Sequence, residues 1–475
     1  MTSILQLSPI VLVITMIMGF RKPPMYAALG GALLAFLLWL FDVAQPFLFS
    51  TLSSVFVDSL VLFMSTAFVI APGLVFVIYL ERAGANDALS KWVKQLGWQG
   101  AAQVVFLVLG LAPLLEAMTG FGVSLIATVP LLIALMGRKV ALRVALTGMC
   151  IMPWGTLGLA TVIGAELAGL PSQTLGAWTA WTSAPVFTAG VLLALWLAGH
   201  RKVTAYALGV VFSVAFVSIL HLISRDVGPE VAGVGAAATV TLVGIIWARL
   251  HLKSNIRFPV EAWPYAALLI AIISLKATNL SLGLDTLWVI HGEQVSWKPL
   301  ASPGIALLLV NFILMVKLGG EELAKPFLSR AKRPLITIFF FLFMSQLLVK
   351  AGFLDGVRLA LSSLDTAALA PLIAAFGGLA GYITGSNVGG NAIVMPSIAH
   401  MNLPENVLSV LAAVQNSAAG HAALGSMPIV ALLLGLAKGS AEEEQELIRF
   451  AFLLALFNVI LVGSAGYLLI SLTGG

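Results

Sequence analysis

The chain has 475 residues, of which 60% are hydrophobic and only 9% are charged. Because a soluble domain carries about 25% charged residues, this composition excludes a soluble globule and predicts an all-α polytopic membrane protein. The net charge of +5 is ordinary for membrane-protein loops, and no basic stripe with interleaved aromatic residues predicts a nucleic-acid partner.

Apolar runs long enough to cross a bilayer follow one another along the chain. Twelve candidate spans lie near residues 4–20, 25–41, 50–80, 141–168, 178–199, 203–224, 229–250, 262–278, 299–318, 333–350, 405–437 and 447–472. With these spans, the loops rich in Lys and Arg fall on one side of the membrane. Cytoplasmic loops collect such residues, so we expect this side to be the cytoplasm and both termini to lie on the far side.

Two further apolar stretches, residues 101–137 and 366–400, are longer than one span. Small polar residues interrupt each of them, with the sequences EAMTGFG at 116–122 and TGSNVGGN at 384–391. Irregular backbone at membrane depth is tolerated only where it is buried in protein or lines a cavity. We therefore predict two re-entrant helical hairpins, each of which enters and leaves on the same side.

Short segments recur at a nearly constant offset, which predicts an internal repeat. The matching segments are LERAG and LVKAG at residues 80–84 and 348–352, Thr-Gly at 119–120 and 384–385, and Leu-Gly at 157–158 and 424–425. The loop after the first hairpin, RKVALR, is basic, whereas HMNLPEN after the second has no Lys or Arg. The two copies are thus predicted to face opposite ways, although chance similarity among small residues is the alternative.

The repeat predicts three parts of the chain. Residues 1–200 form the first repeat, with the hairpin at 101–137 and a broken helix at 141–168, and residues 203–250 form two linking helices. Residues 262–475 form the second, inverted repeat, with the hairpin at 366–400 and a broken helix at 405–437. Inverted repeats with interrupted helices at matching positions are typical of secondary transporters.

The broken helices carry the interruptions PWGTLG at 153–158 and QNSAAGHAALGS at 415–426. Unwinding frees backbone N–H groups, and a half-helix N-terminus with about +0.5 charge binds carboxylates well. We therefore predict a site for a small anion at the four interruptions. Small polar side chains also join helices to one another, which is the alternative. The candidate substrate-binding residues are Thr119, Gly120, Gly122, Trp154, Thr156, Thr384, Gly385, Ser386, Asn387, Asn391, Asn416, Ser417 and His421.

Glu116 is the only charged residue in an apolar run from residue 101 to residue 137. An ionisable group at membrane depth is by default a functional candidate, and burial disfavours the charged form of a carboxyl group. Glu116 is therefore predicted to carry a coupling proton, unless it only holds the hairpin tip by accepting backbone N–H groups. His421 is a second candidate because imidazole titrates at about pH 6.5, although a hydrogen-bonded core histidine is equally consistent.

The stretches LLEAMTGFGVSLIATVPLLIALMG, YITGSNVGGNAI and NSAAGHAALGSMP resemble the L-lactate permease family of bacterial 2-hydroxymonocarboxylate transporters. The resemblance covers residues 50–200 and 330–470. It implies proton symport of L-lactate, glycolate or D-lactate into the cell across the bacterial cytoplasmic (inner) membrane. It also implies an elevator-type cycle, with a moving transport domain and a static scaffold that could support a homodimer. We expect no cofactor and no metal.

The sequence departs from the family's pattern at two positions. Asn387 stands where the family usually has Asp, and Leu424 stands where it usually has Lys. Because the two lost charges have opposite signs, the net charge of the site is unchanged. The departures leave the cargo and the coupling ion open. The alternative is a sodium-coupled transporter of another small carboxylate, with Na⁺ held by unwound carbonyl groups near Gly389.

Two other classes fit the sequence less well. A channel needs a continuous pore lined by rings of carbonyls or charges, whereas inverted repeats with hairpins favour alternating access. An intramembrane enzyme needs a nucleophile with a base, or a metal constellation. The chain has one cysteine, Cys150, and no HExxH motif, so we expect a protein that is not an enzyme.

Overall fold

The computed structural model describes residues 2–120, 124–252, 257–356, 364–401, 403–437 and 441–473. Within them the chain is almost entirely helical, and the only strands are the two-residue β1 (Ile290–His291) and β2 (Ser296–Trp297), which pair antiparallel. The predicted all-α polytopic architecture is therefore confirmed. Long apolar side chains along nearly every element explain it, because in lipid a helix satisfies all of its own backbone groups.

The first part of the chain runs from the N-terminus to the end of the second linking helix. Its elements are α1 (Thr2–Ile14), η1 (Thr15–Gly19), α2 (Pro24–Leu40), α3 (Phe49–Arg82), α4 (Ala85–Gln95), α5 (Gly100–Val105), η2 (Phe106–Leu111), α6 (Ala112–Thr119), α7 (Ser124–Met136), α8 (Arg138–Thr147), η3 (Met152–Trp154), α9 (Gly155–Ala168), α10 (Ser172–Leu197), α11 (Val203–Asp226) and α12 (Pro229–His251).

The second part contains the strand pair between two groups of helices. Its helical elements are η4 (Val260–Ala262), α13 (Trp263–Leu282), α14 (Leu284–Leu287), η5 (Pro299–Ala301), α15 (Gly304–Leu318), α16 (Ala324–Lys350), α18 (Thr366–Thr384), α19 (Asn387–Ala399), α20 (Glu405–Ala423), α21 (Met427–Ala437) and α22 (Ala441–Thr473).

Ten helices in the described ranges are long and apolar enough to cross a membrane, and the bent pair α8–α9 raises the number to eleven. The prediction of twelve spans differs from these numbers because of the lengths of individual helices. The predicted spans at 4–20, 25–41 and 299–318 are shorter apolar helices, whereas the first arms of the two predicted hairpins, Gly100–Thr119 and Thr366–Thr384, are themselves long enough to be counted.

Both predicted hairpin interruptions are breaks between helices. Helix α6 ends at Gly120, whose φ of +68° is one that residues with side chains rarely adopt. Helix α18 ends at Gly385 with φ +64°, and Ser386 begins α19 by accepting a hydrogen bond from the N–H of Gly389.

The first predicted broken helix is interrupted where expected. The second is interrupted only at the end of its predicted segment, because α20 continues as regular helix through Asn416, Ser417 and His421 to Ala423. Helices α8 and α9 meet at an angle of 61°. Three consecutive residues in α9 adopt left-handed backbone angles, with φ of 51° at Thr156, 57° at Leu157 and 69° at Gly158. In the second half, the break between α20 and α21 falls at residues 424–426.

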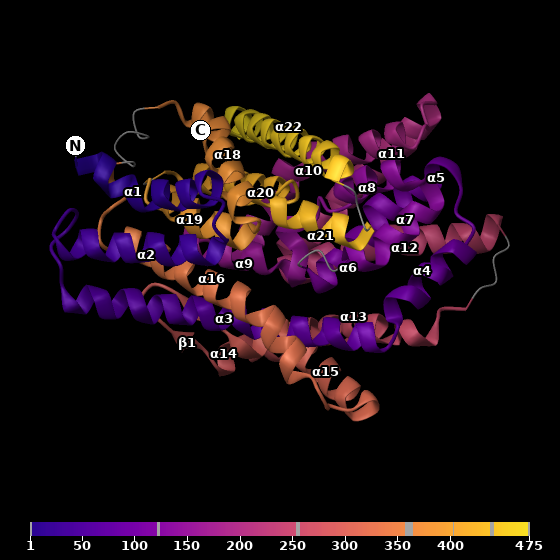
Figure 1. The fold of residues 1–475 in the computed structure, drawn as a ribbon, viewed down its shortest axis with the longest axis horizontal. Coiled ribbons are helices and arrows are strands. Elements are labelled where there is room, and N and C mark those ends of the chain that lie inside the picture. The colour runs from indigo at the N-terminus through magenta and orange to yellow at the C-terminus, as the bar shows by residue number, and fades with distance from the viewer. Residues whose placement is uncertain are drawn as a thin grey trace.

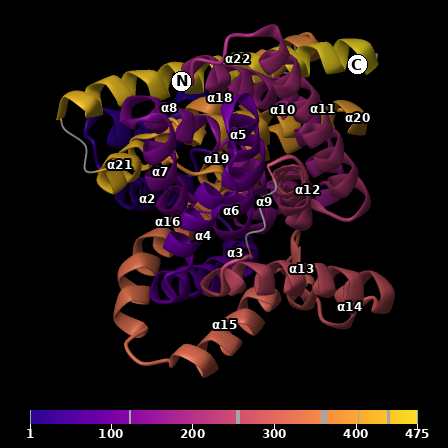
Figure 2. The ribbon, with the colours of Figure 1, turned by 90° about the vertical axis from the view of Figure 1, so that its right-hand side faces the viewer.

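The long helices form two groups. Helices α2, α3 and α16 pack together, and α13 and α15 extend this group, which we call the α3–α16 layer. Helices α9, α10, α18, α19, α20 and α22 pack together in what we call the α10–α20 layer. Figures 1 and 2 show α22 at one edge of the molecule and α13, α14 and α15 at the opposite edge. The hairpin breaks lie in or against the α10–α20 layer.

Candidate functional site

The end of α6 at Gly120, which is the first predicted hairpin tip, lies against the break in α9. A Cβ atom at Gly120 would overlap the hydroxyl group of Thr156, so only glycine allows this approach. Thr119 is buried, and its hydroxyl group donates to the Leu115 carbonyl at 2.6 Å. Gly120 and Thr156, which were predicted from separate motifs, are therefore brought together, whereas Gly122 lies outside the described residues.

Glu116 is 1% exposed in this tip. The hydroxyl group of Ser124, at the start of α7, donates to its Oε2 at 2.6 Å. The carboxyl group therefore ties one arm of the hairpin to the other. This contact is compatible with a structural role and with a role in carrying a proton, because a carboxyl group can accept from Ser124 in either protonation state.

The second hairpin tip lies against the break between α20 and α21. A Cβ at Gly385 would lie 3.2 Å from the Ser426 hydroxyl and 3.2 Å from the Pro428 ring. The Thr384 hydroxyl lies 2.8 Å from the Ala380 carbonyl oxygen and 2.9 Å from the Ser386 carbonyl oxygen, and its one hydrogen can be donated to either. Thr384 and Ser386 thus use their side chains to shape the turn.

Three predicted asparagines meet in one buried cluster. Asn391 donates to Oδ1 of Asn416 at 2.9 Å and to the Ala160 carbonyl at 3.0 Å, and Asn387 donates to the same Oδ1 at 3.2 Å. Asn416 in turn donates to the hydroxyls of Thr161 at 2.9 Å and Thr179 at 3.1 Å. The cluster joins α19 and α20 of the second half to α9 and α10 of the first.

A second polar chain fastens α20 to α10. Ser417 lies 2.6 Å from the Thr182 hydroxyl and 2.9 Å from that of Ser183. His421 is fully buried, with its Nε2 atom 2.8 Å from the Ser183 hydroxyl and its ring 5.9 Å from that of Phe187. Its Nδ1 atom has no hydrogen-bond partner among the described residues. In this conformation both residues therefore join helices.

Trp154 is fully buried beneath the linking helices. Its Nε1 donates to the Ser224 hydroxyl at 3.2 Å, and a Cβ at Gly233 would lie 2.7 Å from the Cβ of Trp154. The indole thus anchors η3 to α11 and α12. The linking helices α11 and α12 therefore pack against the residue that precedes the break in α9.

A cavity of about 390 Å³ opens beside that break. It lies between α9, α12, α13 and the segment from Asp285 to Pro303, and Leu157 of the left-handed turn lines it. The described candidate residues are not among its lining residues. Five charged side chains do line it: Glu166, Glu230, Lys276, Asp285 and Lys298.

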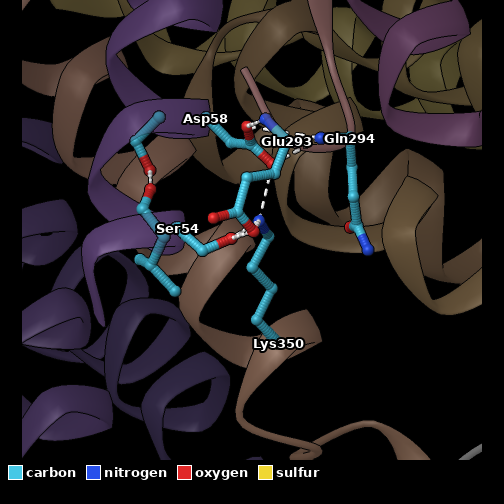
Figure 3. Close-up of polar contacts among 7 residues, drawn as sticks. Ser54, Asp58, Glu293, Gln294 and Lys350 are labelled. Atoms are coloured by element: carbon cyan, nitrogen blue, oxygen red, sulfur yellow. Dashed lines mark hydrogen bonds and ion pairs between the residues drawn. The ribbon is translucent and has the colours of Figure 1, made fainter. Parts of the chain in front are cut away.

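The α3–α16 layer contains a buried ion pair that was not predicted from the sequence. Lys350 of α16 lies 2.6 Å from Asp58 of α3, and their side chains are 7% and 0% exposed. Ser54 bonds to both Lys350 and Glu293, and Asp58 accepts the backbone N–H of Glu293 at 2.6 Å (Figure 3). The signal was available, because Asp58 is a lone acidic residue inside the span predicted at 50–80, as Glu116 is in its own run.

Comparison with known proteins gives one clear result. A family model described as L-lactate permease matches residues 2–263, which is more than half of the chain. A search of curated proteins found no match. The matched part contains the first hairpin, the break in α9 and both linking helices. The part of the resemblance at 330–470 lies outside it. The chain is therefore a multi-pass membrane protein that belongs to the L-lactate permease family, a family of transporters.

Proposed function

We propose that the protein imports L-lactate, or a related 2-hydroxymonocarboxylate such as glycolate or D-lactate, by proton symport across the bacterial cytoplasmic membrane. The observation that carries the proposal is the approach of a hairpin tip to a helix break in a chain of the L-lactate permease family, with Gly120 against Thr156. The second tip at Gly385 has the same relation to the break beside Ser426.

The cargo's carboxylate would bind at these breaks. Helix starts and left-handed turns present backbone N–H groups that have no partner within the helix, and these groups favour anions. Ser386 and Asn387 stand at the start of α19, and Thr156 stands in the turn of α9. Asn387 and Asn391 each keep a buried carbonyl oxygen without a partner among the described residues, and such oxygens suit the hydroxyl group of a 2-hydroxy acid.

An elevator-type cycle fits the distribution of polar contacts. Helices α3 and α16 pack against α9 and α19, yet no side-chain hydrogen bond or ion pair among the described residues joins the two pairs. Other polar ties lie within one layer, as in the asparagine cluster and the Asp58–Lys350 pair, and the Lys276–Glu230 pair links α13 to the linking helix α12. A boundary of mainly apolar contacts can slide without breaking directional bonds, which supports a transport domain moving along a scaffold.

We assign the coupling proton to Glu116. It is the carboxyl group at the first hairpin tip, and a cargo anion bound there would bring a second negative charge close to it. Uptake of a proton by Glu116 would remove that repulsion. His421 remains the second candidate, at the end of the polar chain through Ser183 and Ser417.

The test is uptake of radiolabelled L-lactate into proteoliposomes with and without an inward proton gradient. We expect accumulation that depends on the gradient and that unlabelled glycolate competes away. A sodium gradient at equal pH on both sides serves as the control for the coupling ion. Accumulation driven only by sodium would reject proton symport, and no uptake by folded protein would reject lactate as the cargo.

A further inference from the structure

The charged cavity beside α9 has a feature that the hairpin-tip site does not use. Lys276 of α13 pairs with Glu230 of α12 at 3.2 Å, and their side chains are 13% and 15% exposed. Both residues line the cavity of about 390 Å³. The pair therefore lies inside the cavity and joins the α3–α16 layer to a linking helix.

The pairing of Lys276 is incomplete on the carboxylate side. Only Oε1 of Glu230 bonds to the lysine, and its buried Oε2 has no hydrogen-bond partner among the described residues. An ion pair that is removed from water is strong when both charges are satisfied and costly when one of them is left alone. Loss of an anionic partner is therefore unfavourable for Lys276, but a bound anion could take the place of Glu230 as that partner.

Glu230 stays stabilised if it leaves Lys276. It lies in the first turn of α12, a helix of 23 residues, and the Ncap residue is Gly228, which has no side chain to cap the helix. The positive end of the helix dipole and the unpartnered N–H groups of the first turn both favour a carboxylate at that position. The release of Glu230 is thus less unfavourable than the release of an ordinary buried carboxylate.

The pair also stands beside the break in α9. A Cβ at Gly158 would lie 2.5 Å from the Pro229 carbonyl and 2.9 Å from the Glu230 backbone nitrogen. Leu157 of the same left-handed turn lines the cavity. An anion held by Lys276 would therefore sit next to the turn that Gly120 contacts from the first hairpin.

We propose that Lys276 is a capture site for a small carboxylate, which binds by replacing Glu230 as the partner of the lysine. The proposal rests on the proposed function for the class of ligand, and it adds a binding step before the hairpin tips. The second lysine of the cavity, Lys298, is the natural control. It pairs with Asp285 at 3.1 Å, but it is 48% exposed, and water screens such a pair.

The experiment compares three variants of the full-length protein in detergent: Lys276→Gln, Glu230→Gln and the control Lys298→Gln. The dissociation constant of L-lactate is measured by isothermal titration calorimetry. We expect K276Q to weaken binding about tenfold or more, because a charge-assisted hydrogen bond is lost. We expect E230Q to tighten binding severalfold, because the competing carboxylate is gone, and K298Q to change it by less than about twofold.

If a carboxylate ligand replaces Glu230 as the partner of Lys276, the dissociation constant must rise in K276Q and fall in E230Q. If the pair only stabilises the fold, K276Q and E230Q will change binding in the same direction or not at all, and the proposal is overturned. If K276Q does not fold, E230Q must still tighten binding, and Lys276→Arg must keep the wild-type affinity.

Failure of the proposed function gives a different pattern. One such pattern is weaker lactate binding by K276Q and tighter binding by E230Q, without accumulation of lactate in proteoliposomes. This result would reject proton-driven import and support the capture site. If the wild type binds only another carboxylate from a panel of acetate, glycolate and pyruvate, lactate is rejected as cargo and the same comparison is decisive with that ligand. If the wild type binds no carboxylate in the panel, the capture site is rejected.

Discussion

Replacing Asp58 by asparagine should destabilise the protein strongly, because it leaves Lys350 as a buried cation without its partner. Asp58 is fully buried, Lys350 is 7% exposed, and the Nζ–Oδ2 distance is 2.6 Å. The next carboxylate, that of Glu293, is 3.8 Å from Nζ and 62% exposed, so it compensates only in part. Breaking such a pair costs about 3–5 kcal/mol, a large fraction of a total stability of about 5–15 kcal/mol.

The double variant Asp58→Asn/Lys350→Met separates this charge effect from packing. Asparagine can still accept one backbone N–H from residues 293–294, and methionine fills the volume of the lysine stem without a charge. We therefore expect the double variant to be more stable than D58N alone. Thermal unfolding in one detergent, followed by tryptophan fluorescence, measures the order of stability.

The control for the pair is Glu81→Gln, which breaks the ion pair with Arg330 at 2.8 Å in the same two helices. Its side chains are 34% and 38% exposed, so the loss should be at most about 1 kcal/mol. The reasoning is refuted if D58N unfolds at the same temperature as E81Q. It is also refuted if adding Lys350→Met to D58N lowers the stability further.

Four other variants test the hairpin tips and the polar cluster. Gly120→Ala should lower uptake more than tenfold, since its backbone angles, φ +68° and ψ −170°, lie in a region essentially confined to glycine that costs alanine about 1–3 kcal/mol, and its Cβ would overlap the α9 break. Gly435→Ala, with nothing within 4 Å, should be near wild type, and equal uptake by both would contradict the fit. Glu116→Gln should abolish accumulation driven by a proton gradient but leave lactate exchange intact, and full accumulation would exclude Glu116 as the proton carrier. His421→Gln should keep accumulation if Glu116 alone carries the proton, whereas loss of coupling with exchange preserved would transfer the role to His421. Asn416→Ala should cost at least about 2 kcal/mol in thermal unfolding, because its neighbours lose buried hydrogen bonds, and an unchanged unfolding temperature would mean that the cluster is not needed for stability.

The sequence predicted several breaks well because a Gly next to Thr or Ser in an otherwise apolar run favours the end of a helix. Gly120, Gly385 and the turn at 156–158 all lie where the motifs indicated. The number of spans was less predictable, because hydropathy does not distinguish the arm of a hairpin from a short crossing helix, as Gly100–Thr119 illustrates.

The contacts of the candidate residues could not be predicted in the same way. A composition argument cannot say whether Asn416 or Ser417 points to a ligand or to a neighbouring helix, and both make buried contacts with α10. The ion pair between Lys276 and Glu230 also could not be predicted from the sequence. Each residue lies inside a predicted span, but only the packing of α12 on α13 brings the two charges together.

The asparagine cluster also has a consequence for how the chain is assembled during synthesis. The threonines of the first half, Thr161 and Thr179, already donate to carbonyls near them in sequence, at 2.7 Å each. Their hydroxyl groups therefore have hydrogen-bond acceptors before the second half is synthesised, which lowers the free-energy cost of exposing them to lipid. Asn391 and Asn416 emerge later, and much of their hydrogen bonding comes from α9 and α10. Because domains fold from the N-terminus as they are made, the half that needs partners enters a membrane in which those partners are already in place.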